Sequence, residues 1–262
     1  MKITIIGAGI GGLTAAIALR QAGFETDIFE SAQELKPVGA GIFMWSNAMQ
    51  VFDRLGIAEE IKAAGWEIET AYITNRHLNP ITRYDIQQRV TSRYGVGNIA
   101  ITRARLQEIL LQQVPHGSIR LGKRVHQMES LKDGVRLTFN NGEVHEAALV
   151  IAADGIHSVA RKSIEGTCTP RYSGQTCWRG ISRYTLPESF HHKSYEIWGD
   201  EAGLRFGFGP VSAKEVYWFS TALAPEGQKD EAGSTIESLQ TRYASLDPIV
   251  KNLLAETDYS SV

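Results

Sequence analysis

The start of the chain carries the most regular pattern of apolar and polar positions. An apolar run at residues 3–6 predicts a strand, a small and apolar stretch at 13–19 predicts a helix, and a β-branched and apolar run at 26–29 predicts another strand. The connection at 7–12 reads Gly-Ala-Gly-Ile-Gly-Gly. This order of elements predicts a β-α-β unit with parallel strands.

Shorter elements follow, assigned from apolar periodicity and from residues that start and stop helices. The run Asn-Asn-Gly at 140–142, between two alternating segments, is a hairpin signal. The uninterrupted apolar run at 148–152 predicts a central, buried parallel strand. The other elements expected before residue 148 are a loop (35–42), two helices (47–55, 58–64), irregular strands (66–95), a helix (103–114) capped by Thr102, and the hairpin strands (135–139, 143–147).

The pattern changes beyond about residue 170. Strand-like segments there carry many aromatic residues and predict a sheet distinct from that of the first β-α-β unit. Two helical patterns follow them. The expected strands are 178–184, 195–198, 205–208 and 216–222, and the expected helices are 234–245 and 248–256.

The glycine-rich connection carries the first chemical signal. Gly7 allows a tight turn, Gly9 lets the backbone approach a pyrophosphate, and Gly12 lets the helix pack closely on the strand. The helix N-terminus adds free N–H groups and a positive dipole end. Glu30, at the end of the second strand, can accept hydrogen bonds from a ribose diol. Together these features predict an adenine dinucleotide site and leave both FAD and NAD open.

Composition describes an ordinary globular protein and narrows its partners. The chain has 262 residues, of which 43% are hydrophobic and 21% charged, and its net charge is −2. This charge gives no general attraction to nucleic acid or acidic membranes, so any anion site must be local. Beyond the first strand and helix, no segment is long and apolar enough to span a bilayer. Cys168 and Cys177 lack metal-ligand spacing, so no metal site is expected, and free thiols favour a cytoplasmic location.

A second motif, Ala-Asp-Gly-Ile-His-Ser-Val-Ala-Arg, occupies residues 153–161. Asp154 and Gly155 follow a predicted parallel strand, at the sheet edge where open α/β sheets bind ligands. The motif resembles the Asp-Gly motif of the FAD-dependent aromatic hydroxylases, the group A flavoprotein monooxygenases of the 4-hydroxybenzoate hydroxylase type. The glycine motif, the loop at 37–42 and the Arg-Ala-Arg-Leu stretch at 103–106 match that family in the same order. The chain looks closest to its urate hydroxylase and zeaxanthin epoxidase-like branch.

The resemblance implies a role for each matching residue in holding FAD. Asp154 would lie near the phosphates and be linked to reduction by NAD(P)H, and Arg103 would approach the phosphate or ribityl region. Val125 would contact the adenine through its backbone, and the small residues at 39–41 would let a moving flavin ring pass. The cofactor-binding set implied in this way is Gly7, Gly9, Ile10, Gly12, Glu30, Gly39, Ala40, Gly41, Arg103, Val125, Asp154 and Gly155.

Arg205 and Tyr217 fall on positions that face the substrate in the urate hydroxylase pattern, so they are the candidate catalytic residues. An arginine can fix an anionic or carbonyl-rich ring. A tyrosine can hydrogen-bond or deprotonate a phenol-like group. The alternative for each residue is that it is an ordinary strand residue that does not contact the substrate.

The resemblance also implies an activity. NAD(P)H would reduce FAD, and O2 would give a C4a-hydroperoxyflavin that transfers its distal oxygen to a small, electron-rich aromatic substrate. The sequence does not decide whether the protein forms a homodimer. Neither nucleic acid nor a membrane is an expected partner. The alternatives are a related epoxidase, halogenase or prenyl reductase, and a catalytically silent FAD-binding module.

The expected fold class is α/β. A Rossmann-like, doubly wound FAD-binding domain would occupy residues 1–170, with the irregular strands at about 66–95 inserted, and a mixed-sheet substrate domain would occupy 171–262. The family carries a further Gly-Asp motif after its substrate domain, and the sequence contains no match to it. We therefore expect a piece of a longer enzyme, incomplete in its second domain, or a site completed in trans.

Overall fold

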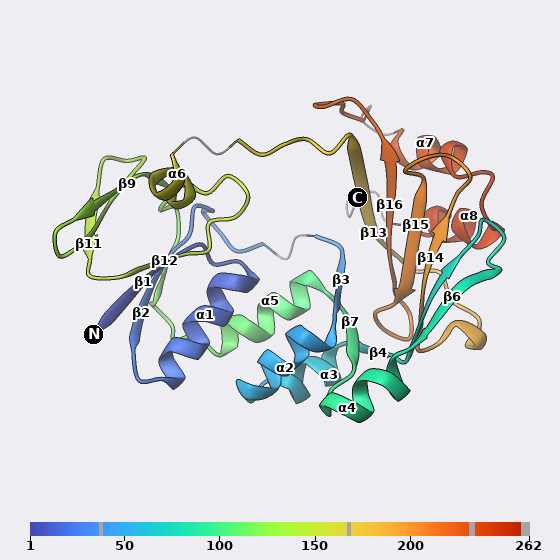
Figure 1. Ribbon diagram of the computed structural model, residues 1–262, viewed down its shortest axis with the longest axis horizontal. Helices are drawn as coiled ribbons and strands as arrows, with labels where there is room; N and C mark the ends of the chain where they lie inside the picture. Colours follow the sequence, from blue (N-terminus) through green and yellow to red (C-terminus); the bar gives the residue numbers. More distant parts are fainter. Residues whose placement is uncertain (37–38, 167–168, 231–233, 258–262) are drawn as a thin grey trace. The chain divides into compact units, whose positions relative to one another are not determined.

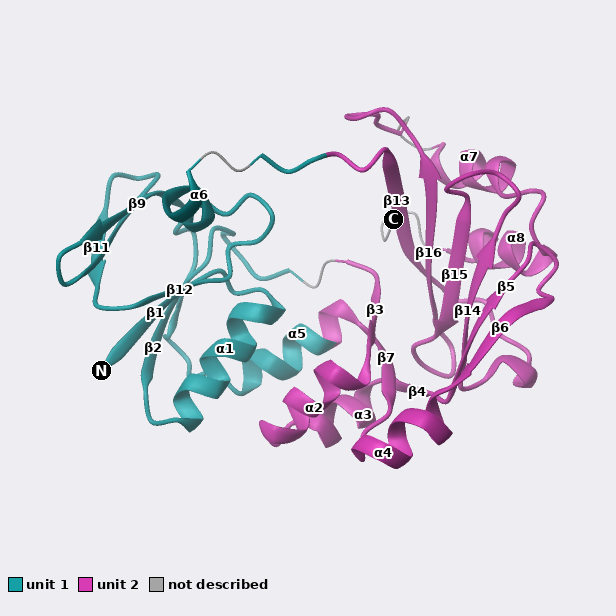
Figure 2. Cartoon of the chain, viewed as in Figure 1, with its two compact units in different colours: residues 1–37, 106–171 teal, residues 38–105, 172–262 magenta. Residues whose placement is uncertain are grey.

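The computed structural model describes residues 1–36, 39–166, 169–230 and 234–257 (Figure 1). The chain groups into two compact units (Figure 2). Unit 1 comprises Met1–Pro37 and Leu106–Arg171, and unit 2 comprises Val38–Arg105 and Tyr172–Val262.

Residues 38–105 lie in unit 2, whereas the sequence pattern places them in the first of two domains, 1–170 and 171–262. Strand pairing is the reason. Strand β5 (Thr70–Thr74) pairs in parallel with β14 (Lys193–Trp198), and β6 (Pro80–Asp85) pairs with β5. Two strands within the expected 66–95 segment, β5 and β6, thus extend the later sheet, and the chain passes from unit 1 to unit 2 after Arg171.

Unit 1 is built on a four-stranded parallel sheet. Its order is β12 (Val150–Ala152), β1 (Lys2–Ile6), β2 (Glu25–Phe29) and β8 (Ile119–Arg120). Helix α1 (Ile10–Gln21) connects β1 to β2, which are parallel and in register. The predicted β-α-β unit is confirmed.

The apolar run at 148–152 forms β12, which is parallel to β1 as predicted. It lies at the outer end of the described strand order, however, and Leu149 before it is 44% exposed. The prediction of a central, buried strand is therefore wrong. Apolar side chains indicate burial of a strand but do not fix how many strands flank it.

A three-stranded antiparallel sheet completes unit 1, in the order β11 (Val144–Ala147), β10 (Gly134–Phe139) and β9 (Val125–Leu131). The predicted hairpin is β10 with β11. Apolar side chains from both sheets of the unit form one cluster, which is Ile6, Phe29, Val125, Leu137 and Phe139.

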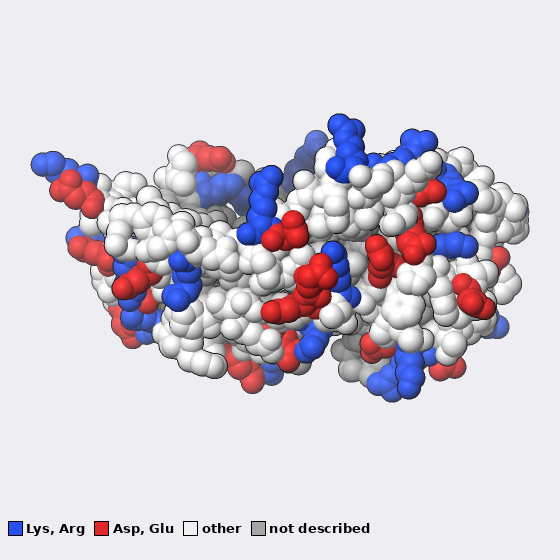
Figure 3. All heavy atoms as spheres, turned by 90° about the horizontal axis from the view of Figure 1, so that it is seen from below, with Lys and Arg blue, Asp and Glu red and all other residues white. Residues whose placement is uncertain are grey.

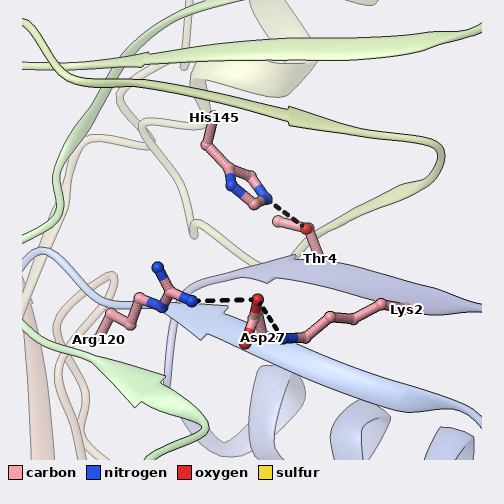
Figure 4. Close-up of polar contacts among 5 residues, drawn as sticks. All are labelled: Lys2, Thr4, Asp27, Arg120 and His145. Carbon is pink, nitrogen blue, oxygen red and sulfur yellow. Dashed lines mark hydrogen bonds and ion pairs between the residues drawn. The ribbon is translucent and has the colours of Figure 1, made fainter.

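A polar cluster lies on the same side of the parallel sheet as the apolar cluster that contains Ile6 and Phe29 (Figure 4). The buried Asp27 carboxylate is 2.8 Å from Lys2 Nζ and 3.4 Å from Arg120 Nη2. Thr4, which is opposite Asp27 in the register, has its hydroxyl 3.0 Å from His145 Nε2. The charges on Asp27 are compensated within the unit, as burial of a carboxylate requires.

Burial lowers the pKa of His145, and the cations Arg120 and Lys2 add to this while Asp27 opposes it. The folded protein therefore binds this proton less readily than the unfolded chain, so stability is lost as pH falls below ~6.5 through the folded pKa. We expect His145→Phe to reduce the fall in melting temperature between about pH 7.5 and about pH 5. His126→Phe, at an exposed position of β9, is the control. If the melting temperatures of the two variants had the same pH dependence, His145 would not be the source of the acid destabilisation.

Unit 2 contains a six-stranded mixed sheet in the order β13–β16–β15–β14–β5–β6. Its further strands are β13 (Gln175–Ser182), β15 (Arg205–Pro210) and β16 (Val216–Leu223). Helices α7 (Thr235–Arg242) and α8 (Pro248–Ala255) pack on one face. The core on that face includes Phe206, Phe208, Trp218, Tyr243, Leu253 and Leu254.

The remaining elements of unit 2 surround a small sheet of β3 (Gly41–Met44), β7 (Asn98–Thr102) and β4 (Trp66–Ile68). The residues after β6 are helical rather than extended, which corrects the end of the expected 66–95 segment. The helices of this part are α2 (Ser46–Arg54), α3 (Ala58–Ala64), a π-helical turn (Gln87–Thr91) and α4 (Ser92–Tyr94). Helix α5 (Arg103–Gln112) begins in unit 2 and continues into unit 1. Helix α6 (Val159–Glu165) belongs to unit 1.

The predicted α/β class, a Rossmann-like unit with a second mixed sheet, is confirmed. Among the helices of the described segments, none has the length and apolar character needed to cross a bilayer. Acidic and basic side chains are interspersed on the face drawn in Figure 3, as the small net charge leads one to expect.

Candidate cofactor and substrate sites

The turn from β1 into α1 requires glycine at two positions. Gly7 has a φ of +99°, and a Cβ there would lie 2.4 Å from the Ala153 carbonyl oxygen. A Cβ on Gly12 would lie 1.9 Å from the Gly7 carbonyl oxygen. No side chain fits such spacings, so the motif brings the turn, the helix and the start of the Asp-Gly motif into direct backbone contact.

A cavity of about 310 Å³ opens beside this turn, within unit 1. It lies at the carboxyl ends of β1, β2 and β12, the edge at which open parallel sheets bind ligands. Ile10 and Gly12 belong to the first turn of the adjoining helix rather than to the wall. The predicted residues that line the cavity are Gly7, Gly9, Glu30, Val125, Asp154 and Gly155.

The Glu30 carboxylate is fixed by the backbone on both sides. Its Oε2 accepts a 2.7 Å hydrogen bond from the Ala8 N–H, and its Oε1 accepts one of 2.8 Å from the Ala32 N–H. Burial raises the pKa of Glu30, but these backbone bonds, with Ser31, outweigh it and hold the pKa below its usual value. Glu30 is thus an ionised acceptor at neutral pH, and a carboxylate retains lone pairs for a diol.

Asp154 has a structural contact that the sequence analysis did not foresee. Its Oδ2 accepts hydrogen bonds from the N–H groups of Val159, at 2.8 Å, and Ala160, at 3.3 Å, in the first turn of α6. The Ser158 hydroxyl caps the same helix by accepting from the Arg161 N–H at 2.9 Å. Asp154 therefore both lines the cavity and holds the helix that follows it.

We expect Asp154→Ala to lower the unfolding free energy by about 1 kcal/mol, the usual cost of losing a helix cap. Ser158→Ala removes the other cap of the same helix, at a residue outside the cavity wall. Denaturant unfolding with and without FAD compares the two. If Asp154 also serves the cofactor, FAD stabilises the Ser158 variant more than the Asp154 variant; equal stabilisation would leave Asp154 a cap alone.

Three basic residues in the wall were not predicted as site residues, namely Lys123, Arg124 and His157. Arg124 and His157 are exposed, whereas Lys123 is paired with Glu143, and none of the three occupies a glycine or acid position that defines the motifs. The adjacent pair Lys123-Arg124 before Val125 was the available signal. Arg124 supplies the local positive charge that a nearly neutral chain needs in order to bind an anion.

The residues of this cavity fit an adenine dinucleotide. A Cβ on Gly9 would meet no protein atom within 4 Å, so the backbone there is open to a ligand. The N-terminus of α1, twelve residues long and without a side-chain cap, offers its first N–H groups to a pyrophosphate. Glu30 occupies the position at the end of the second strand from which an acidic residue hydrogen-bonds the ribose diol.

The other predicted cofactor residues lie together in unit 2. The Arg103 N–H donates a 3.0 Å hydrogen bond to the Ala40 carbonyl, and a Cβ on Gly39 would lie 3.2 Å from Arg103 Cδ. Gly41 packs directly on Tyr217, because a Cβ there would lie 2.4 Å from Tyr217 Cγ. The structure thus joins the loop at 39–41 to one of the two candidate catalytic residues.

Tyr217 is buried, with 6% of its surface exposed. Burial raises the pKa of its phenol, while the nearby guanidinium groups of Arg179 and Arg103 reduce the effect. The phenol therefore stays protonated at neutral pH. It is suited to donate a hydrogen bond to a carbonyl or phenolate oxygen rather than to act as a base.

Arg205 is on the strand next to Tyr217 but at a different level of the sheet. Gly209 is opposite Tyr217, whereas Arg205 is opposite Thr221, so the two side chains are separated by about 13 Å along the strands. Arg205 Nη1 is 3.1 Å from Glu196 Oε1, and its guanidinium lies over the Trp198 ring at 4.9 Å. The structure does not bring the two candidate residues together.

Comparison with known proteins identifies relatives along the whole described chain. Residues 1–257 match the FAD binding domain family model. The aurachin C monooxygenase/isomerase of Stigmatella aurantiaca is 37% identical over all 262 residues, which span 67% of that protein. The FAD-dependent urate hydroxylase of Klebsiella pneumoniae is 33% identical over 98% of the chain, again spanning 67% of the relative.

Solved structures also resemble this chain over nearly its whole length. Klebsiella pneumoniae HpxO complexed with FAD and uric acid superposes with a TM-score of 0.89 at 30% identity, covering 100% of this chain and 66% of that one. The 2,6-dihydroxypyridine-3-hydroxylase of Arthrobacter nicotinovorans has a TM-score of 0.80 at 19% identity, over 98% of this chain and 70% of that one, and shares the fold.

Proposed function

We propose residue roles for this chain from the premise that it belongs to the FAD-binding-domain family and, within it, to the FAD-dependent monooxygenases. Its activity is oxygen insertion into a small molecule with FAD as cofactor. The observation that carries the proposal is the cavity beside the glycine turn, which joins Gly9, Glu30 and Asp154 in one wall.

The first unit would hold the adenosine half of FAD. The backbone at Gly9 and the N-terminus of α1 would bind the pyrophosphate, Arg124 would neutralise it, and Glu30 would accept from the ribose. When bound, FAD supplies the redox and O2 chemistry that side chains lack. We infer that Arg103 and residues 39–41 serve its flavin half, and that NAD(P)H and O2 are the co-substrates.

The second unit would bind the substrate on the sheet face that carries Tyr217. The buried, protonated Tyr217 would orient an aromatic or heteroaromatic ring through one hydrogen bond from its phenol to a ring oxygen. Arg205, already paired with Glu196, would set the polarity at the far end of that face. A cytoplasmic location and a homodimer complete the proposal, the former resting on the low cysteine content.

The test is turnover of the purified protein supplied with FAD, NAD(P)H and ¹⁸O2. We expect an NAD(P)H-dependent product that carries one labelled oxygen, detected by mass spectrometry. Tyr217→Phe should lower kcat/KM by roughly tenfold, as loss of one ligand hydrogen bond predicts, and leave FAD retention unchanged. Peroxide as the only product across phenols, hydroxybenzoates and purines would overturn the substrate class.

A further inference from the structure

The strand register shows which side chains share the face of the six-stranded sheet opposite α7 and α8, here called the front face. Residues directly opposite one another on paired strands project to the same side. One such row crosses all six strands and contains Tyr217. Its members, from β6 to β13, are Tyr84, Ala71, Ser194, Gly209, Tyr217 and Ile181.

The middle of this row is made of small residues. Ala71 is opposite Ser194, and a Cβ on Gly209 would lie 3.4 Å from Ser194 Cβ, so the three residues are neighbours on three strands, between the large rings of Tyr84 and Tyr217. A hollow of about 260 Å³ lies over this part of the sheet, bounded by Phe43 and Trp45 as well as by sheet residues. Its size is slightly below that of pockets for drug-sized ligands, so it suits one ring or a short chain.

Aromatic side chains pack closely along one edge of the hollow. A Cβ on Gly209 would lie 3.0 Å from the Phe43 ring, and a Cβ on Gly207 would lie 2.1 Å from the Phe219 ring. Both rings also line the hollow. Glycine on β15 therefore lets two aromatic rings lie against the sheet, where they form an apolar wall.

The hollow offers no uncompensated charge among the described residues that line it. Glu196 is its one carboxylate, and that group is paired with Arg205 at 3.1 Å and accepts a 2.8 Å hydrogen bond from the Trp198 indole. A cation would have to compete with Arg205, and an anion would be repelled. An uncharged, apolar group is the occupant that loses least on leaving water.

The hollow adjoins the proposed substrate position, and the Phe43 and Phe219 rings lie between the two. The Phe43 ring centroid is 5.4 Å from that of Tyr217, and the Phe219 centroid is 6.2 Å from it. A molecule whose polar ring meets the Tyr217 hydroxyl thus has an apolar space beside it, across Phe43 and Phe219.

We propose that this hollow binds an apolar substituent, alkyl or aryl, carried by the aromatic ring of the substrate. The substrate class is then a substituted, lipophilic aromatic compound rather than a compact polar ring. This inference rests on the proposed function, because it takes Tyr217 as the anchor of the ring. The small side chains of Ala71 and Ser194, which line the hollow, determine how much apolar volume is accepted.

The test compares the binding of phenol and 4-pentylphenol to the FAD-loaded protein by equilibrium dialysis. Each buried methylene is worth ~0.8 kcal/mol, about fourfold in affinity, so we expect the pentyl chain to tighten binding by at least about tenfold. Ala71→Leu fills the hollow and should reduce that gain to about twofold or less. Ala71→Ser, which adds little volume, should keep it.

Further variants separate filling of the hollow from damage to the fold. Arg83→Leu places the same new side chain on β6 but opposite Tyr72, on the other face of the sheet, and should keep the full gain. Thr82→Phe covers the hollow from an exposed edge position and replaces Ala71→Leu if that variant unfolds. Melting curves verify folding.

An equal gain from the pentyl chain in the wild type and in the filled variant would overturn the inference, as would no gain in the wild type. In either case the chain binds elsewhere, or the hollow serves an aromatic side chain of another protein segment. This outcome is distinct from failure of the proposed function. The binding ratio needs no turnover, whereas the proposed function fails through the absence of labelled product.

Discussion

Gly9→Val should abolish retention of FAD while leaving unit 1 folded. Gly9 has φ near −73°, which any residue adopts, and no protein atom lies within 4 Å of its added Cβ. The valine would instead occupy the space through which the pyrophosphate reaches the N-terminus of α1. Hydrogen bonds to charged groups are worth ~1.5–3 kcal/mol each, so losing two weakens FAD binding by roughly a hundredfold or more.

The neighbouring glycines provide the matched variants. Gly11→Val also adds a side chain in open space, but Gly11 does not line the cavity, so FAD retention should persist. Gly12→Val collides with the Gly7 carbonyl and should unfold the turn itself. Absorbance of flavin after desalting and the far-ultraviolet spectrum are measured for all three. If the Gly9 and Gly11 variants retained FAD equally, the pyrophosphate would not approach the backbone at Gly9.

Trp218→Ala should destabilise unit 2 by about 3–5 kcal/mol, the usual range for a large buried aromatic residue. The Trp218 side chain is fully buried, stacks on Phe206 at 5.5 Å, and lies against Gly180, where a Cβ would be 2.7 Å from its ring. Its indole N–H donates a 2.8 Å hydrogen bond to the Thr257 hydroxyl. Denaturant unfolding monitored by circular dichroism measures the loss.

Two substitutions divide that loss into its parts. Thr257→Val removes the hydroxyl that accepts from Trp218 and donates to the Leu253 carbonyl oxygen at 2.7 Å. This should cost about 1–3 kcal/mol, because the buried indole N–H is left without a partner. Trp198→Ala, at a position 40% exposed on the same sheet, should cost less than about 1 kcal/mol. If Trp218→Ala and Trp198→Ala shift the midpoint equally, the sheet does not depend on this core.

The elements predicted well are those whose signals are local. The pattern at 3–29 gives β1, α1 and β2 because turn, helix and strands follow one another along the chain. The pairing of β5 with β14 has no such signal, since the two strands are far apart in sequence and either could pair elsewhere. The domain assignment of 38–105 differs from the structure for this reason.

The candidate site divides in the same way. Gly7, Gly9 and Glu30 are set by one motif, so their common cavity follows from sequence. The capping contact of Asp154 is also local, but an acid five residues before a helical N–H reads equally well as a ligand residue. Nothing local connects Ala71 with Gly209, and the small-residue row appears only once the register of β5, β14 and β15 is known.

The row of Ala71, Ser194 and Gly209 also has a consequence for comparing sequences. Because Ala71 and Ser194 line the hollow, a relative with a bulkier residue at either position would accept a shorter substituent, and a bulkier residue at Gly209 would displace the Phe43 ring from the apolar wall. Three alignment columns, none of them in the glycine or Asp-Gly motifs, would then sort such enzymes by substrate size. Directed libraries confined to these columns could retune selectivity without disturbing the nucleotide-binding turn.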